Sequence, residues 1–314
     1  MIYTLTLNPA IDREMTVSEI GLDRVLRAIA VQTDFGGKGF NVSRALLALG
    51  IESIALGFIG GATGDQMVAG LTQLGITTDF IRVQGETRIN LSVVDVDHTH
   101  YLKVNEPGPP VSNAAVVAML EKIGSLAKKG DWWTLAGSSP PGIQPTFVAE
   151  IIHRIQDAGA FTLLDMEGDY LKEGCASNAF LFKPNAIEAG ELIGHQISTI
   201  HDGLDALAKI HVIGAKQVVI SLGKAGAVYS DGLHAWWAEP PSIRERNPIG
   251  AGDAMLAGLV WALQKNLGGS DVLRWGVACG AAAASLDGTA VGSLPLVESM
   301  ASDVRIGDRS NYGK

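Results

Sequence analysis

The spacing of hydrophobic residues along this 314-residue chain switches repeatedly between the patterns typical of strands and of helices. Short apolar or alternating runs predict strands, and apolar residues three and four positions apart predict helices. Strands are predicted at residues 2–7, 51–60, 80–83, 132–136, 160–164, 179–182 and 217–221. Helices are predicted at residues 42–49, 64–74, 113–127, 145–157, 204–213, 253–263 and 271–286. Because strands and helices alternate, we predict an α/β fold with a mostly parallel sheet flanked by helices.

Two segments do not follow this alternation. Residues 87–94 and 100–104 each alternate between polar and apolar positions around a turn, which predicts a β-hairpin with one polar face. We expect such a hairpin to cover a site or to form a dimer interface. The tail, residues 303–314, is polar and is expected to be loosely ordered.

Polar or glycine-rich residues follow the predicted strands at several points. These positions are Asp12, Ser138, residues 183–185, residues 221–226 and residues 250–253. In a parallel sheet the carboxyl ends of the strands meet at one edge, where open α/β sheets bind ligands. The pattern therefore predicts a single cleft with contributions from distant parts of the chain.

The loop before the helix at residues 253–263 carries the main candidate for catalysis. Gly250, Ala251 and Gly252 allow a sharp turn, and Asp253 falls in the first turn of the helix. The free amides of that turn make an anion site, and a carboxylate beside them could take a proton from an attacking hydroxyl during phosphoryl transfer. The alternative interpretation is a structural turn in which Asp253 only caps the helix.

A second glycine-rich loop, Gly36-Gly37-Lys38-Gly39, opens the helix predicted at residues 42–49. Lys38 is followed by glycine rather than by Ser or Thr, so the loop does not match a nucleotide-binding P-loop. It does not match the dinucleotide-binding pattern either, which argues against an oxidoreductase. Lys38 is either a solvated loop lysine or a ligand for an anionic group.

Composition narrows the possible partners and the location. The net charge of −9 and the isoelectric point near 5.2 argue against nucleic acid or an acidic membrane surface as the main partner, and an anionic substrate would need a local basic site. Cys175 and Cys279 lack metal-like spacing and are expected to be buried, reduced thiols. With no secretory signal and no apolar run long enough to span a bilayer, we expect a cytoplasmic protein.

The two glycine-rich loops together resemble those of a known family. Gly36-Gly37-Lys38-Gly39-x-Asn41 followed much later by Gly250-Ala251-Gly252-Asp253 is similar to the PfkB (ribokinase-like) carbohydrate kinases, and the resemblance covers nearly the whole chain. Residues 6–12, 85–90 and 105–109 resemble the branch that acts on hexose phosphates. The resemblance implies ATP- and Mg²⁺-dependent phosphorylation of a phosphorylated ketohexose, with fructose 1-phosphate as the first choice. Tagatose 6-phosphate and fructose 6-phosphate remain alternative acceptors.

The resemblance also implies roles for individual residues. Asp253 would be the catalytic base, and the amides of Gly250, Ala251 and Gly252 would form the anion hole. The sugar hydroxyls would be bound by Asp12, Gly36, Gly37 and Asn41. The substrate's own phosphate would be held by Lys38, Arg88 and Ser138, with Arg27 as a further candidate. ATP would face Lys183, Asn185, Ser221, Leu222, Gly223, Lys224, Ala225, Gly226 and Gly252, and Glu188 would place Mg²⁺ through water.

For the fold, the resemblance implies a single α/β kinase domain over residues 1–314 with a small β-sheet lid. The lid would be formed by inserted strands at about residues 12–35 and 86–106, and it implies a homodimer. The match is incomplete at Asp287-Gly288-Thr289-Ala290, which only partly fits the monovalent-cation loop of some relatives, so K⁺ stays open.

Two other functions compete with this one. A kinase for an unphosphorylated sugar or a nucleoside would leave Lys38 and Arg88 without a role. A non-catalytic sugar-phosphate sensor would not need the base Asp253.

Overall fold

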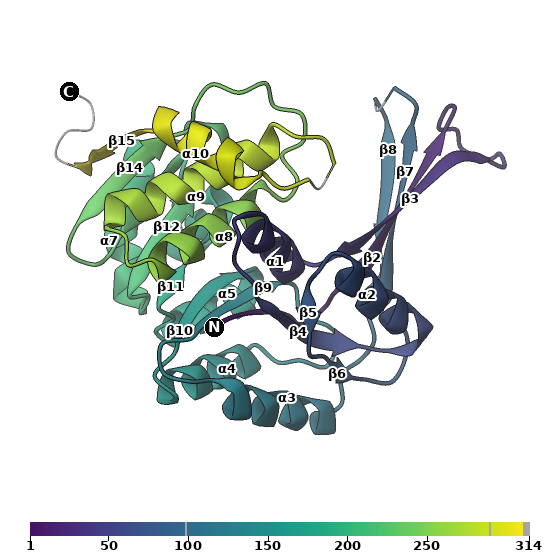
Figure 1. Ribbon diagram of the computed structural model, residues 1–314, viewed down its shortest axis with the longest axis horizontal. Helices are drawn as coiled ribbons and strands as arrows, with labels where there is room; N and C mark the ends of the chain where they lie inside the picture. Colours follow the sequence, from purple (N-terminus) through teal and green to yellow (C-terminus); the bar gives the residue numbers. More distant parts are fainter. Residues whose placement is uncertain (98, 289, 310–314) are drawn as a thin grey trace.

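The computed structural model describes residues 1–97, 99–288 and 290–309, which form a layered body with a small sheet protruding from it (Figure 1). The strands of the body are β1 (Ile2–Thr6), β4 (Ile54–Ile59), β5 (Thr77–Thr78), β6 (Ile81–Arg82), β9 (Trp132–Gly137), β10 (Phe161–Met166), β11 (Leu181–Phe182), β12 (Gln217–Ser221), β13 (Ala227–Ser230), β14 (Ala235–Glu239) and β15 (Arg305–Asp308). Their order in the large sheet is β15-β14-β13-β12-β11-β10-β9-β1-β4-β5, with β6 beside β4. All neighbours from β12 to β5 run parallel, so the carboxyl ends of these strands share one edge.

Helices cover both faces of the large sheet (Figure 1). One face carries α1 (Lys38–Ala48), α8 (Ala251–Gln264), α9 (Gly269–Ala284) and α10 (Leu294–Asp303), and α2 (Gly61–Gln73) packs beside α1. The other face carries α3 (Asn113–Leu126), α4 (Thr146–Asp157), α5 (Gly168–Ala176), α6 (Ala186–Ile193) and α7 (Ile200–Ile213). Side chains alternate across a strand, so the adjacent residues Trp132 and Trp133 of β9 enter the two opposite cores. The predicted α/β fold is confirmed.

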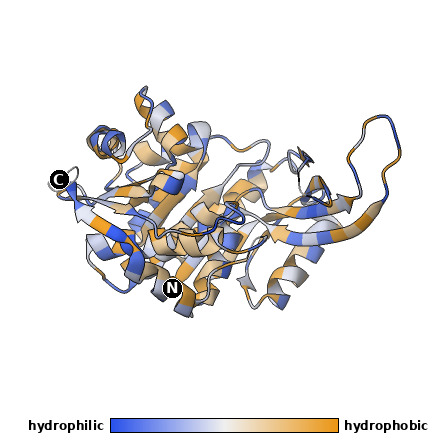
Figure 2. Ribbon diagram, turned by 90° about the horizontal axis from the view of Figure 1, so that it is seen from above, coloured by the Kyte–Doolittle hydropathy of each residue, from blue (hydrophilic) through white to orange (hydrophobic). Residues whose placement is uncertain are grey.

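The second sheet is built from β2 (Ala10–Val17), β3 (Ala28–Gly36), β7 (Arg88–Asp95) and β8 (Tyr101–Asn105), in the order β3-β2-β7-β8. Its presence confirms the predicted small sheet, and β7 and β8 form the hairpin expected from the alternating pattern. Figure 2 shows these strands extending away from the body with polar and apolar residues mixed along them. Ala10 and Gly36 pair where the sheet meets the body, so β2 and β3 begin and end at the predicted cleft.

One sequence-based expectation is wrong. Residues 305–308, expected to be loosely ordered, form β15 and pair antiparallel with β14 at the sheet edge. The polar composition misled the prediction because an edge strand needs backbone partners more than apolar side chains. Residues 310–314 of the same tail lie outside the described residues.

Among the described residues, no helix combines the length and the apolar character that a membrane crossing requires.

Candidate active site

The catalytic candidate Asp253 is positioned by the start of α8. Gly250 adopts a left-handed conformation with φ of 82° at the N-cap, and Asp253 follows as the third residue of the helix. The first amides of a helix have no partner inside it, so those near Gly252 point toward the cleft edge of the sheet. The Ala251 amide differs from the prediction, because it donates to the Pro248 carbonyl at 3.2 Å and is therefore already engaged.

Asp253 is 7% exposed and accepts a hydrogen bond from Asn41 Nδ2 at 2.8 Å. Burial, followed by the nearby Asp165 carboxylate, raises the pKa of Asp253 to about 6. The Asn41 hydrogen bond and the charges of Lys38 and Lys183 lower this pKa and limit the shift. A carboxylate with a pKa near neutrality is suited to accept a proton at physiological pH.

A buried carboxylate between two lysines lies next to Asp253. Asp165, at the end of β10, contacts Lys38 Nζ at 3.1 Å and Lys183 Nζ at 2.7 Å. Burial would raise the pKa of Asp165, but the two lysines outweigh it and lower the pKa. Burial would likewise lower the pKa of Lys38, but Asp165 and Asp253 outweigh it and raise the pKa. Lys38 is therefore held charged at the cleft.

The small sheet supplies Asp12, whose Oδ1 accepts a hydrogen bond from Asn90 Nδ2 at 2.8 Å. Burial raises the pKa of Asp12, and the Asn90 hydrogen bond opposes the shift. A Cβ atom on Gly36 would lie 1.9 Å from Asp12 Oδ2, so the glycine is needed for the close approach of the loop to this carboxylate. Asp12, Gly36 and Gly37 thus meet where the small sheet joins α1.

Arg88 lies at the same junction, beside a second hollow of about 420 Å³. Its two terminal nitrogens donate to the Glu106 carbonyl at 3.1 Å, the Asn8 carbonyl at 3.0 Å and Ser138 Oγ at 3.4 Å. Its Nε is buried without a partner among the described residues. The partners of Arg88 are thus neutral, and burial lowers its pKa. An Arg held this way at a hollow is suited to bind an anion.

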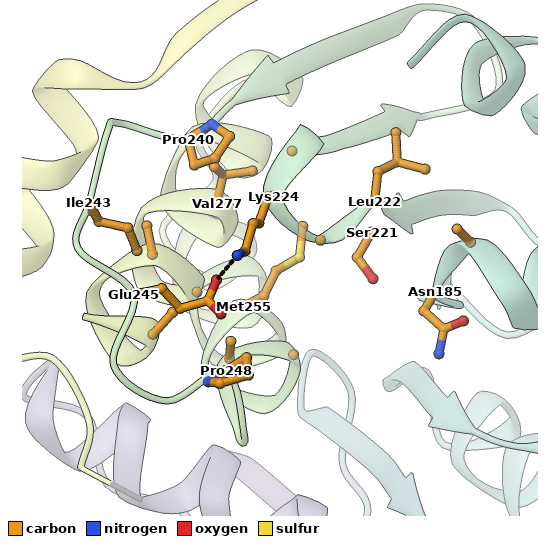
Figure 3. A pocket seen from close by; sticks show the side chains of 18 of the residues that line it. Asn185, Ser221, Leu222, Lys224, Pro240, Ile243, Glu245, Pro248, Met255 and Val277 are labelled. Carbon is orange, nitrogen blue, oxygen red and sulfur yellow. Dashed lines mark ion pairs between the residues drawn. The ribbon is translucent and has the colours of Figure 1, made fainter. Parts of the chain in front are cut away.

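A larger cavity of about 830 Å³ opens beside the start of α8, where Gly252 and Met255 line it (Figure 3). One end is polar, with Asn185, Ser221 and the amides around Gly252. The rest of the wall is mainly apolar and is formed by Pro240, Pro241, Ile243, Met255, Val277, Ala281 and Ala284. Lys224 crosses this space to pair with Glu245 at 3.3 Å, as Figure 3 shows. An apolar slot with a polar, amide-rich end is suited to a nucleotide.

Most of the predicted site residues therefore converge on one edge of the sheet, but Arg27 does not. It is exposed and directly precedes Ala28, which pairs with Val17 at the outer end of the small sheet. Ala28 and Gly36 are eight positions apart along an extended strand, a span of about 26 Å. Within one chain, Arg27 is consequently remote from Asp12 and Arg88.

Sequence reasoning missed several residues of this site. Asp165 and Asn90 stand at or near strand ends, a signal that was present but not specific enough to select them. The apolar wall from α9, including Val277 and Ala281, looks in sequence like an ordinary buried helix face. In the possible cation loop, Thr289 lies outside the described residues, and Asp287 pairs with Arg246 at 2.6 Å.

Comparison with known proteins agrees with this geometry. The sequence profile of the pfkB family carbohydrate kinases matches residues 5–295. The chain belongs to this family. A 1-phosphofructokinase of Bacillus subtilis is 32% identical, with 98% of this chain and 99% of the relative covered. A tagatose-6-phosphate kinase of Staphylococcus epidermidis is 30% identical over 84% of this chain and 85% of the relative.

Solved structures give the same family. Phosphofructokinase-2 from Escherichia coli in complex with potassium has a TM-score of 0.91 and 30% identity, covering 96% of this chain and 98% of that one. The family predicted from the two glycine-rich loops is thereby confirmed, and with it the assignment of the chain as a carbohydrate kinase. A kinase of this family needs one place for the nucleotide and one for the carbohydrate. The cavity beside Gly252 and the junction near Asp12 are two such places.

Proposed function

We propose that this kinase transfers the γ-phosphoryl group of ATP to a ketohexose that already carries a phosphate, with fructose 1-phosphate as its acceptor and fructose 1,6-bisphosphate as its product. The observation that carries the proposal is Arg88, whose hydrogen bonds go to neutral acceptors at a hollow beside Asp12. A neutral sugar would leave Arg88 without a charged group in direct contact, since the carboxylates of Asp12, Glu167 and Glu106 act on it only from beyond hydrogen-bonding distance. A phosphate on the acceptor would supply such a group.

The proposed arrangement places the acceptor between Arg88 and Asp253. Arg88 and Ser138 hold its phosphate, and Asp12, Asn41 and the loop of Gly36 and Gly37 hold its hydroxyls. Asp253 takes the proton from the attacking hydroxyl, since its pKa of about 6 leaves it ionised at neutral pH. Lys38 and the free amides at the start of α8 stabilise the charge on the transferred group.

ATP is proposed to occupy the 830 Å³ cavity, with its base in the apolar slot and its phosphates toward Lys183, Asn185 and the loop at residues 221–226. The residues also fit Mg²⁺. Glu188 is held by the Asn185 amide at 2.8 Å, and burial, with Asp165 nearby, raises its pKa. A divalent cation nearby would stabilise the charged form of this buried carboxylate. The same cation would neutralise the phosphates of the nucleotide.

The choice of acceptor follows the named relatives. Several are 1-phosphofructokinases, which supports fructose 1-phosphate. The alternatives are tagatose 6-phosphate and fructose 6-phosphate, in line with the tagatose-6-phosphate kinase and phosphofructokinase-2 among the similar proteins.

The test is release of ADP from Mg-ATP with fructose 1-phosphate, tagatose 6-phosphate, fructose 6-phosphate or free fructose as acceptor. We expect fructose 1-phosphate to give the highest kcat/KM and Arg88→Gln to lower it by roughly 100-fold, since a buried charge-assisted contact is lost. Arg82→Gln, which removes an exposed ion pair with Asp65, is the matched control. Preference for free fructose, or an Arg88→Gln variant as active as wild type, would contradict the proposal.

We also propose that residues 1–314 act as one kinase domain, with the small sheet as a lid that joins two copies. The outer part of the sheet exposes apolar side chains, among them Ile29 at 64%, Val31 at 58% and Tyr101 at 72%. Pairing of two copies would cover them, and it would give Arg27 its only route to a site, namely that of the second copy. Light scattering would then report a dimer, and Val31→Lys would shift it to a monomer.

The proposed location is the cytoplasm, in keeping with two buried, free cysteines.

A further inference from the structure

An ion pair outside the catalytic cluster connects the small sheet to α1. Arg44 on α1 binds Asp34 on β3 through both terminal nitrogens, with Nη1 donating to Asp34 Oδ2 at 3.0 Å. Nη2 also donates to the Phe35 carbonyl at 2.9 Å. The two side chains are only 11% and 22% exposed. A buried bidentate pair of this kind fixes both distance and orientation, unlike an exposed ion pair.

The pair spans the junction between the small sheet and the body. Strand β3 continues from Asp34 through Phe35, Gly36 and Gly37 directly into α1. The Phe35 ring fills the space above Gly70 of α2, where a Cβ would lie 2.0 Å from it. Glycine is intrinsically permissive in backbone conformation, and at Gly36 and Gly37 the Arg44 contacts with Asp34 and the Phe35 carbonyl fix the junction.

Both ends of the pair lie next to residues of the proposed acceptor site. On β3, Asp34 stands directly opposite Asp12 of β2 in the antiparallel register, so their side chains share a face. On α1, Asn41 contacts Asp253 and Lys38 contacts Asp165. Two carboxylates opposite each other repel, and the positive charge of Arg44 offsets this for Asp34.

We propose that Arg44 is a positioning residue, which by holding Asp34 fixes the small sheet against α1 and so sets Asp12 at the right distance from Asn41 and Asp253. The inference rests on the proposed kinase function. Arg44 touches neither the nucleotide cavity nor its walls, which come from residues 185–284. Its role therefore concerns the acceptor and not ATP.

The test compares Arg44→Gln, Asp34→Asn, the double variant and wild type in steady-state kinetics. We expect each single variant to raise the KM of the phosphorylated hexose at least roughly tenfold, while the Kd of Mg-ADP, measured by calorimetry, stays within about twofold. Each single variant already removes the Arg44–Asp34 ion pair. The KM of the double variant should therefore resemble that of the worse single variant instead of showing the product of the two effects. Arg44→Lys, which keeps one ion pair, should fall between wild type and Arg44→Gln.

Controls separate the possible failures. Arg82→Gln breaks an exposed Arg–Asp pair between α2 and the β6 region and should leave both constants unchanged. If Arg44→Gln unfolds, the comparison of Asp34→Asn with Arg44→Lys still tests the inference. An unchanged acceptor KM, or equal weakening of acceptor and nucleotide, would overturn it. Absence of turnover in wild type would instead count against the proposed function.

Discussion

Asn41 and Asp253 are 212 positions apart in the chain, and Asn41 Nδ2 donates a 2.8 Å hydrogen bond to Asp253 Oδ2. The contact joins the first residues of α1 to the first turn of α8, each of which follows a glycine-rich loop. It places a group proposed to bind the sugar against the proposed base. The two glycine-rich motifs that identified the family are therefore in direct contact in the folded protein.

Asp253→Asn should lower kcat by on the order of 10²–10⁴, because the general base is lost. The KM of ATP should stay near the wild-type value, as the cavity wall is unchanged. Asp271→Asn, which alters an exposed acid in the first turn of α9, is the control and should retain full activity. Full activity of Asp253→Asn would remove Asp253 from the mechanism.

The dependence of kcat/KM on pH should report the ionisation of Asp253. Its pKa of about 6 means that activity rises with pH through that value and levels off above it, because only the ionised carboxylate accepts a proton. The Asn41 hydrogen bond lowers this pKa, so Asn41→Leu should move the acidic limb to higher pH. A limb that stays in place in Asn41→Leu would show that another group controls it.

The same shift predicts a stability effect. A folded pKa above the unfolded value means that the ionised Asp253 destabilises the fold, and this cost builds up as pH rises from the unfolded value of 3.8 and is complete above about 6. Asp253→Asn should therefore melt no lower than wild type at pH 8, and at pH 5 the advantage should shrink. Differential scanning calorimetry at the two pH values tests this, and a lower Tm at pH 8 would contradict it.

Asp165→Asn should destabilise the protein by about 3–5 kcal/mol, since it leaves the buried Lys183 and the partly exposed Lys38 without their common partner. The pKa of Asp165 is lowered, so its carboxylate is ionised throughout pH 5–8. Because Asp165 also raises the pKa of Asp253, the loss should be constant only above about pH 7, where Asp253 is ionised as well. Denaturant unfolding measures it. Asp65→Asn, in an exposed ion pair, should cost less than about 1 kcal/mol.

Ala281→Leu should fill part of the apolar slot and raise the KM of ATP at least roughly tenfold, because the larger side chain takes up space that the nucleotide needs. The KM of the acceptor should change little. Ser270→Leu, near the opposite end of α9, is the matched control. Equal nucleotide affinity in Ala281→Leu would place the base elsewhere.

How much the sequence predicted depended on the kind of signal. Glycine-rich loops at helix starts are distinctive, so the positions of Lys38, Asn41 and Asp253 could be predicted together. Asp165 also follows a strand, but a single carboxylate at a strand end is common, and only the two lysines that surround it in the fold reveal its importance. Arg27 was assigned to the site only through the family resemblance, and within one chain the strand β3 carries it away from Asp12 and Arg88.

The strands that the sequence analysis missed share another cause. Strands β13, β14 and β15 are short, antiparallel and at or near the sheet edge, where pairing with neighbours decides the conformation more than periodicity does. The apolar residues of α9 at the nucleotide cavity obey the helical pattern perfectly well. They differ from core residues only in facing a space that the chain leaves open.

The order of strands in the large sheet has a consequence for how such an enzyme can diversify. The boundary between β9 and β10 divides the sheet into two blocks. The strands of the first block, β1, β4, β5 and β9, all precede residue 138, and the strands of the second block, β10 to β15, all follow residue 160. The proposed acceptor residues through Ser138 fall in the first block, and the walls of the nucleotide cavity fall in the second. Substitutions gathered in one block can therefore retune one substrate while the other is inherited unchanged, provided that the α1–α8 contact at Asn41 and Asp253 is kept.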